Sequence, residues 1–134
     1  MRQSLVNNDQ TVVSIFVNPA QFAPHEDLGT YPRTMESDLR ALQTVQVSIR
    51  SSNSKPESTS STRTPSAIFV PRVSDMYPSG ITQDVEAQKG AFAYVKGYEH
   101  EMEGRSRPGF FRGVATVVLK LFNAVEVRRL TFIE

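Results

Sequence analysis

Hydrophobic residues in this sequence occur in short runs that polar residues interrupt abruptly. The first run, Val12 to Val17, contains three valines and one isoleucine. Such a β-branched run is typical of a strand buried on both faces, as in a parallel sheet flanked by helices. Asn18-Pro19 ends it, because proline lacks an N–H and disfavours helix at the preceding residue. We therefore expect Asn18 and Gln21 at the carboxyl end of a strand, which faces the ligand crevice in open α/β sheets.

A helix and a second strand follow in the pattern. Apolar residues recur at helical spacing from Met35 to about Leu42, after Thr34 as the expected N-cap and with Glu36 in the first turn. Residues Val45 to Ile49 then alternate with the period of a strand. The pattern predicts a β-α-β unit with parallel strands, and hence an α/β fold.

The rest of the chain predicts shorter elements around one long helix. Before the first run, residues 1–11 predict only a frayed helix or an open end. Apolar residues from Val114 to Val125 fall on a single helix face. Further elements are expected as strands at 67–70, 92–95 and 130–133, a loop at 71–80 and a helical turn at 98–103.

The segment 51–66 has a different composition, with ten serines or threonines among its sixteen residues. It contains no large apolar residue, so it cannot bury enough surface to offset the entropy of ordering. We expect a disordered insertion that is dispensable for the fold.

Composition bounds the class of protein. At 134 residues with 39% hydrophobic residues the chain fits one domain, and 15 Lys+Arg against 14 Asp+Glu give a net charge of +1. Bulk charge therefore does not favour nucleic acid or an anionic membrane as partner. The absence of cysteine excludes disulfides, zinc–thiolate sites and thiol nucleophiles. No signal peptide or membrane-spanning run is apparent, so we expect a cytoplasmic protein.

Two groups of residues are candidates for a binding site. Gln21 offers one acceptor and two donors beside a rigid strand end, which suits a hydroxy acid, although a turn-capping role is the simpler interpretation from the residues alone. Asn18 is equally explained as a turn former. The second group, Arg105, Arg107 and Arg112, surrounds a proline turn before a helix N-terminus, where a phosphate or carboxylate is favoured.

Other polar residues carry weaker signals. Glu26, Asp27 and Asp38 could suggest a metal site, but Asp27 and Asp38 lie on different elements. We therefore interpret the three as solvated carboxylates and expect no metal site. Arg33 is either a site residue or an ion-pair partner. The two histidines, His25 and His100, stand in polar surroundings and form no catalytic or ligand spacing.

Several ordered segments together resemble one known family, the pantothenate synthetases (pantoate–β-alanine ligases). The resemblance covers roughly residues 12–50 and 67–125. It is carried by Ser-Ile-Phe-Val-Asn-Pro-Ala-Gln-Phe at 14–22, Tyr-Pro-Arg-Thr at 31–34, Phe-Val-Pro at 69–71, Met-Tyr-Pro at 76–78 and the segment 103–123.

This resemblance implies an incomplete Rossmann-like parallel sheet of the nucleotidyltransferase type. It implies an ATP- and Mg²⁺-dependent enzyme that adenylates pantoate and transfers the pantoyl group to β-alanine, and a homodimer. The residues implied at the substrate site are Gln21, Asn18, Tyr31, Arg107 and Glu103, with Arg105 and Arg112 as anion-binding candidates.

The sequence also departs from the family pattern. The family's His-x-Gly-His-type motif, expected before a segment like Ser4–Val6, is not found, and Gly109 and Phe110 stand where a family histidine is usual. The family's ATP-binding lysine and smaller C-terminal domain would follow Glu134. We therefore expect residues 1–134 to be a partial N-terminal Rossmann-like domain, inactive alone. The alternative is a non-catalytic remnant that keeps a small-acid or anion pocket.

Overall fold

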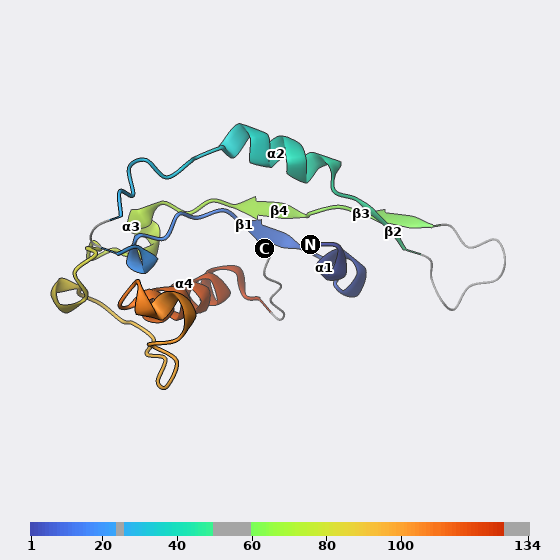
Figure 1. Cartoon of the computed structure of the whole chain (residues 1–134). Coiled ribbons are helices and arrows are strands. Elements are labelled where there is room, and N and C mark those ends of the chain that lie inside the picture. The colour runs from blue at the N-terminus through green and yellow to red at the C-terminus, as the bar shows by residue number, and fades with distance from the viewer. Residues whose placement is uncertain (24–25, 50–59, 128–134) are drawn as a thin grey trace. The chain divides into compact units, whose positions relative to one another are not determined.

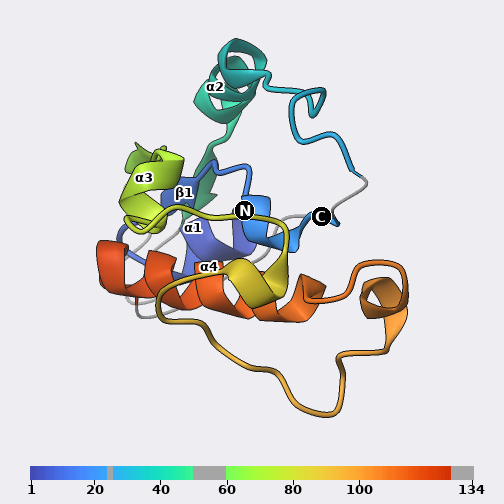
Figure 2. The ribbon, with the colours of Figure 1, turned by 90° about the vertical axis from the view of Figure 1, so that its left-hand side faces the viewer.

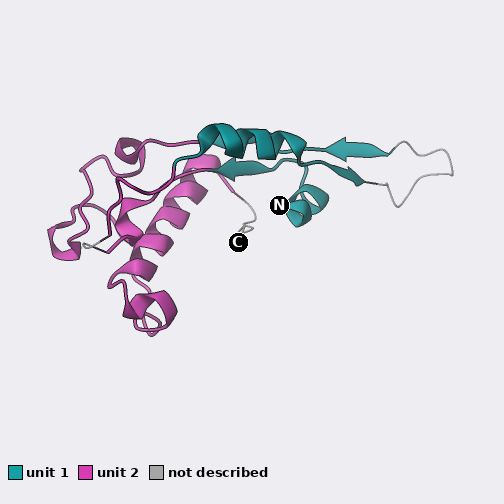
Figure 3. Ribbon diagram, turned by 45° about the horizontal axis from the view of Figure 1, so that its top comes forward, with its two compact units in different colours: residues 1–14, 33–69, 129–134 teal, residues 15–32, 70–128 magenta. Residues whose placement is uncertain are grey.

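The computed structural model describes residues 1–23, 26–49 and 60–127 (Figure 1). The chain forms two compact units, which Figure 3 shows in different colours. Unit 1 comprises residues 1–14, 33–69 and 129–134, and unit 2 comprises residues 15–32 and 70–128. Among the residues described, no helix is long and apolar enough to cross a membrane.

Unit 1 contains a parallel strand pair. Strand β1 (Val12–Ser14) pairs with β4 (Ala67–Phe69), with Val12 opposite Ala67 and Ser14 opposite Phe69. Parallel strands need a long crossover, and the chain between these two includes helix α2 (Met35–Thr44). The prediction of an α/β fold with a parallel sheet is confirmed.

Helix α2 begins and ends close to its predicted limits. Glu36 and Asp38 lie in its first turn, where carboxylates interact favourably with the helix dipole. Thr34 occupies the N-cap position, but its hydroxyl bonds the Asp38 carboxylate at 3.1 Å instead of a backbone N–H. The helix is therefore stabilised at its start by charge more than by a capping hydroxyl.

Two strand predictions in unit 1 were wrong. The first strand has three residues rather than six, and Val12 is 39% exposed, so the strand is not covered on both faces. Strand β2 (Val47–Ile49) pairs with β3 (Ser61–Arg63) in antiparallel fashion, so it does not complete a β-α-β unit with β1. Apolar patterning predicted both segments as extended but carries no information on which strands pair.

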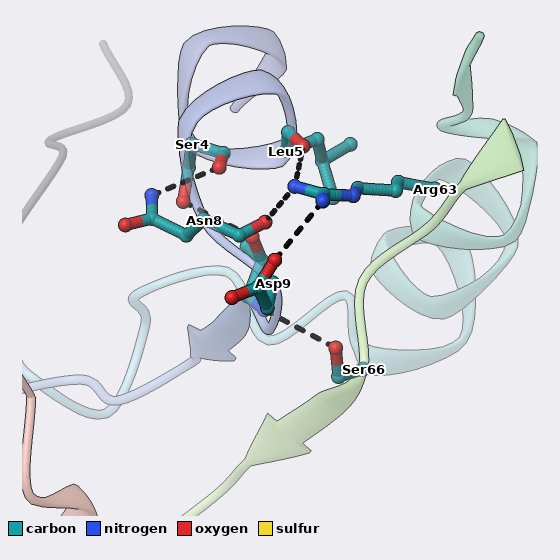
Figure 4. A network of polar contacts seen from close by, with 7 residues as sticks. Ser4, Leu5, Asn8, Asp9, Arg63 and Ser66 are labelled. Atoms are coloured by element: carbon teal, nitrogen blue, oxygen red, sulfur yellow. Dashed lines mark hydrogen bonds and ion pairs between the residues drawn. The ribbon is translucent and has the colours of Figure 1, made fainter. Parts of the chain in front are cut away.

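Strand β3 lies within the segment predicted to be disordered, and that prediction is wrong for residues 61–63. The reason is Arg63, which donates hydrogen bonds to the carbonyls of Leu5 and Asn8 and pairs with the Asp9 carboxylate at 3.0 Å (Figure 4). The last carbonyls of a helix have no intrahelical partner, and a cation there is favoured. Arg63 thus satisfies the C-terminal end of helix α1 (Arg2–Asn7).

The N-terminal segment is more ordered than the sequence indicated. Leu5 of α1 is only 1% exposed, and α1 contacts β2. Thr11 and Ser66 also bond reciprocally, through Thr11 N–H to the Ser66 hydroxyl (3.2 Å) and Ser66 N–H to the Thr11 carbonyl (2.8 Å). Deleting the predicted insertion would therefore remove contacts that hold α1. Its residues 51–59 lie outside the described part of the chain.

Unit 2 is built on helix α4 (Phe110–Val125), which confirms the predicted long helix. Ala20, Met76, Tyr77 and Val117 form its buried core, and Phe92 packs against them. The path from α3 through residues 77–109 to the start of α4 can be followed in Figure 2. Its short elements are η1 (Pro19–Gln21), α3 (Val73–Met76), η2 (Val85–Ala87) and η3 (Met102–Arg105).

The structure corrects two expectations in this unit. The segment 92–95 is irregular instead of a strand, because the Ala93 N–H donates to the Thr116 hydroxyl of α4 (2.9 Å) and not to a sheet partner. The predicted loop at 71–80 contains α3, whose end buries Met76 and Tyr77. The helical turn predicted at 98–103 appears slightly later, as η3, and the strand predicted at 130–133 lies outside the described residues.

Replacing Arg63 by Ala should destabilise unit 1. The substitution removes the donors to two helix carbonyls and an ion pair, and we expect a loss of about 1 to 2 kcal/mol in unfolding free energy after allowance for partial exposure. Urea denaturation measures this. The control is Arg40→Ala, which removes an exposed pair with Glu36 (3.7 Å) and should change stability little. If the two variants lost the same amount of unfolding free energy, the contacts of Arg63 would contribute no more than those of an exposed ion pair.

Candidate functional site

The predicted site residues Asn18 and Gln21 belong to the turn that carries η1. Asn18 precedes η1 in extended conformation, and Pro19 stands at the first position of the turn, where its fixed φ is already suitable and no N–H is required. Pro19 and Ala20 are buried. The turn is therefore held by its own sequence as well as by packing.

The Asn18 side chain is 2% exposed and makes four hydrogen bonds. Its amide nitrogen donates to the Gln21 side-chain oxygen (3.1 Å) and to the Gly113 carbonyl (3.2 Å). Its oxygen accepts from the Ala20 N–H (3.3 Å) and the Tyr77 hydroxyl (2.7 Å). Asn18 was predicted to touch substrate or to form the turn, and these contacts support the structural role.

Gly113 allows η1 to approach α4 at backbone distance. A Cβ atom added to Gly113 would lie 2.3 Å from the Ala20 carbonyl oxygen and 2.9 Å from the Gln21 nitrogen. Real Cβ atoms do not approach backbone so closely, so any side chain here would push the turn away from the helix. Sequence reasoning gave Gly113 no role beyond the family segment.

Tyr77 is a second residue that sequence reasoning did not assign to the site. Its ring stacks on Phe92, with centroids 6.4 Å apart and planes at 20°, and the Lys120 ammonium lies 5.1 Å from its centroid. Burial raises the pKa of the Tyr77 hydroxyl to about 12, and the nearby Arg112 charge lowers it by a smaller amount. The hydroxyl is therefore protonated, and able to donate, at physiological pH.

Gln21 is half-buried, and its side-chain oxygen is taken by Asn18. In the part of the chain that the structure describes, its NH₂ group has no protein acceptor. The two N–H groups are thus available to an oxygen atom of a ligand. This arrangement is compatible with both predicted roles of Gln21, binding of a hydroxy acid and capping of the turn.

Arg107 and Glu103 are brought together as predicted, with a third partner that was missed. Arg107 pairs with Glu26 at 2.6 Å and with Glu103 at 3.3 Å. The other oxygen of the Glu26 carboxylate accepts a hydrogen bond from the Ala23 N–H (2.8 Å). The backbone carbonyl of Glu26 accepts one from the side-chain amide of Gln83 (3.2 Å). Glu26 is thus half-buried and paired, which corrects its interpretation as a solvated carboxylate. The sequence signal that could have indicated this role is the position of Glu26 in the loop that follows the candidate residue Gln21.

The three arginines of the predicted anion site make separate contacts. Arg112 stacks over the Phe92 ring, 3.8 Å from its centroid, and donates to the Gln88 side chain. Arg105 is exposed and donates to the His100 carbonyl (3.2 Å). With Arg107 bound by two carboxylates, the group does not present a shared cationic site.

The other residues considered from the sequence, Tyr31 and the two histidines, do not belong to the turn that carries Gln21. Tyr31 is 48% exposed and meets Phe22 edge to face, with ring centroids 5.4 Å apart. His100 is exposed, and His25 is not among the described residues. Over residues 1–23, 26–49 and 60–127, no three His, Cys, Asp or Glu side chains gather into a group that could hold a metal ion.

Replacing Gly113 by Ala should displace η1 from α4. Alanine favours helix by about 1 kcal/mol over glycine, but the backbone clash should outweigh this and leave a net loss of about 1 to 3 kcal/mol. Thermal unfolding measures the loss. Asn123→Ala, at an exposed position of the same helix, is the control and should be neutral or slightly stabilising. A Gly113→Ala variant as stable as the wild type would mean that the turn can move away without loss.

The chain is similar in sequence to proteins of one family. The family model described as "Pantoate-beta-alanine ligase" matches residues 1–134. A "Pantoate--beta-alanine ligase" of Saccharomyces cerevisiae is 48% identical over 123 residues, which are 92% of this chain and 34% of the yeast protein. A "Pantothenate synthetase" of Acetivibrio thermocellus is 39% identical over 132 residues, 98% of this chain and 38% of that protein.

Solved structures give the same result. A pantothenate synthetase from Thermus thermophilus superposes with a TM-score of 0.66 at 36% identity, over 93% of this chain and 36% of that one. A pantoate-beta-alanine ligase from Francisella tularensis, complexed with "Beta-gamma ATP and Beta-alanine", gives 0.61 at 32% identity over 87% and 35%. The chain thus spans about a third of the length of these relatives. With a match along its whole sequence and a fold in common, it belongs to the pantoate–β-alanine ligase family.

Proposed function

We propose that this chain supplies part of the substrate site of a pantothenate synthetase, which condenses pantoate with β-alanine in an ATP-dependent reaction. Family membership supports the proposal, and so does the solved relative that was complexed with an ATP species and β-alanine. The observation that carries it for this chain is the Gln21 amide, whose oxygen is held by Asn18 and whose NH₂ group has no acceptor among the described residues.

The proposed ligand at Gln21 is pantoate. Pantoate is a hydroxy acid, so its carboxylate and hydroxyl oxygens can accept the two N–H groups of Gln21. Asn18 would orient Gln21 and not contact pantoate itself, since all four hydrogen bonds of its side chain are made within the protein. Tyr31 remains a candidate for a contact at the edge of the site, as the resemblance implies.

The proposed chemistry needs an activated acid because a carboxylate does not expel oxide at neutral pH. A pantoate carboxylate oxygen attacks the α-phosphorus of ATP and pyrophosphate leaves, which gives pantoyl adenylate. The β-alanine amine then attacks the acyl carbon and loses a proton, and AMP leaves with the acyl–oxygen bonding pair. No covalent bond to the protein is required, so the residues of this chain would act by holding and orienting pantoate.

The arginine–carboxylate cluster has a positioning role in this proposal. Arg107 joins Glu26, near η1, to Glu103 of η3, and the two carboxylates more than offset its charge. Such a cluster would fix the loop that follows Gln21 rather than attract an anion. Arg105 and Arg112 remain candidates for contact with an anion, but each would first have to leave its present acceptor, the His100 carbonyl for Arg105 and the Gln88 side chain for Arg112.

Magnesium would enter with the nucleotide. The described residues do not fit a dedicated Mg²⁺ site, since no three of their His, Cys, Asp or Glu side chains form a group that could hold a metal ion. Mg²⁺ usually keeps several waters and is held largely by substrate phosphates, so no step is assigned to it on this chain. We also propose a homodimer, which the family resemblance implies, and a cytoplasmic location, as expected from the sequence. Light scattering of the purified chain would test the dimer.

Gln21→Ala should weaken pantoate binding by about 1 to 3 kcal/mol, because ligand oxygens would lose their donors. Isothermal calorimetry with the 134-residue chain measures this, and thermal unfolding checks that the fold is kept. Gln43→Ala, at an exposed position of α2, is the matched control and should bind pantoate as the wild type does. Unchanged affinity in Gln21→Ala would assign Gln21 to the structure of the turn.

Residues 1–134 alone should not release AMP from ATP in the presence of pantoate and β-alanine. By the resemblance, the groups that hold the triphosphate lie outside these residues, and each missing charge-stabilising group typically costs orders of magnitude in rate. A coupled AMP assay on the purified chain tests this. Turnover within about tenfold of the roughly 10 s⁻¹ typical of enzymes would contradict the expectation.

A further inference from the structure

The orientation of the Asn18 amide is fixed by two backbone groups that each have a single role. The Ala20 N–H can only donate, so the Asn18 atom that faces it at 3.3 Å must be the oxygen. The Gly113 carbonyl can only accept, so the Asn18 atom at 3.2 Å from it must be the NH₂ group. The assignment of oxygen and nitrogen therefore follows from chemistry and not from a choice between two similar amide orientations.

The orientation of Gln21 follows from that of Asn18. The NH₂ group of Asn18 also lies 3.1 Å from the Gln21 amide, and a donor requires an acceptor, so the atom that it meets must be the Gln21 oxygen. The NH₂ group of Gln21 is then at the other end of its amide. Gln21 thus presents donors, not acceptors, to a ligand.

Tyr77 makes the shortest of the four contacts to Asn18. Its hydroxyl lies 2.7 Å from the Asn18 oxygen, against 3.1 to 3.3 Å for the other three, and it must donate because that oxygen can only accept. The ring is 4% exposed and stacks on Phe92, so the hydroxyl has little freedom to leave.

We propose that Tyr77 is a positioning residue that acts through Asn18 to keep the NH₂ group of Gln21 directed at an oxygen of the ligand. The identification of that ligand as pantoate rests on the proposed function. The arrangement selects a ligand atom with a lone pair, such as a carboxylate or hydroxyl oxygen, and disfavours one that must itself donate.

The Tyr77→Phe variant tests the proposal because it removes the hydroxyl and keeps the ring that fills the core. Side-chain amide exchange with solvent, measured by NMR on the ¹⁵N-labelled 134-residue chain, should be slower for Asn18 than for Gln21 in the wild type. In Tyr77→Phe the exchange of the Asn18 amide should accelerate severalfold, and pantoate should bind about threefold to tenfold more weakly. Tyr98→Phe, which removes an exposed hydroxyl of the same unit, is the control and should change neither quantity.

A second variant tests the direction of the hydrogen bond to the ligand. Gln21→Glu keeps an oxygen for Asn18 but places a second oxygen where the NH₂ group was, so it should bind pantoate at least as weakly as Gln21→Ala. This readout does not depend on the folding of Tyr77→Phe. Wild-type affinity in Gln21→Glu would mean that the ligand donates to Gln21, and the proposal would be wrong.

The outcomes separate this inference from the proposed function. Equal exchange of the Asn18 amide in the wild type and Tyr77→Phe, or equal protection of Asn18 and Gln21 in the wild type, overturns the role of Tyr77. If the exchange behaves as expected but wild-type chain does not bind pantoate, the Tyr77–Asn18–Gln21 arrangement stands and the proposed ligand is wrong.

Discussion

The buried amide of Asn18 is the constraint on which unit 2 depends. It lies where η1, α4 and the residue after α3 meet, and each element supplies at least one of its four partners. Leaving one buried polar group unsatisfied typically costs about 1 to 3 kcal/mol, so these elements are coupled through a single side chain. An aspartate of the same shape would lack the two donors to Gln21 and Gly113. The close approach also requires Gly113, because any Cβ there would meet the Ala20 carbonyl.

Charge in the same unit is organised to hold loops and not to collect anions. Arg107 is paired with two carboxylates, Glu26 and Glu103, whereas Arg112 lies over an aromatic ring. The Glu26 carboxylate binds Arg107 through one oxygen and the Ala23 N–H through the other, so it ties the end of the Gln21 turn to the segment before α4. A carboxylate that serves both a cation and a backbone donor is a stronger anchor than an exposed ion pair.

Elements with local causes could be predicted from the sequence, and elements with distant causes could not. Helices α2 and α4 follow from apolar spacing within their own residues, and the Asn18-Pro19 turn follows from proline. The strand β3 was missed because its stability comes from Arg63, which satisfies α1 carbonyls more than fifty residues away in sequence. The segment 92–95 has strand-like composition, but the Ala93 N–H donates to the Thr116 hydroxyl of a helix. Which strands pair, and which groups form hydrogen bonds, depends on the whole fold and cannot be read from a local sequence pattern.

The same division holds for the site and explains its chemistry. Gln21, Asn18 and the Arg107–Glu103 pair could be named as site residues from the family segments. Tyr77 could not, because it looks like an ordinary core residue, and the hydrogen bonds that join Tyr77 to Asn18 and Asn18 to Gln21 exist only in the fold. Because the arginines nearby are already paired or stacked, recognition of an acid here would depend on neutral N–H donors at a fixed place. Neutral donors bind a carboxylate less strongly than a guanidinium does, but they do not retain an anion indiscriminately. In the proposed site, a hydroxy acid would be distinguished by the positions of its oxygens, and this selectivity would come from the hydrogen bonds that hold the Gln21 amide and not from net charge.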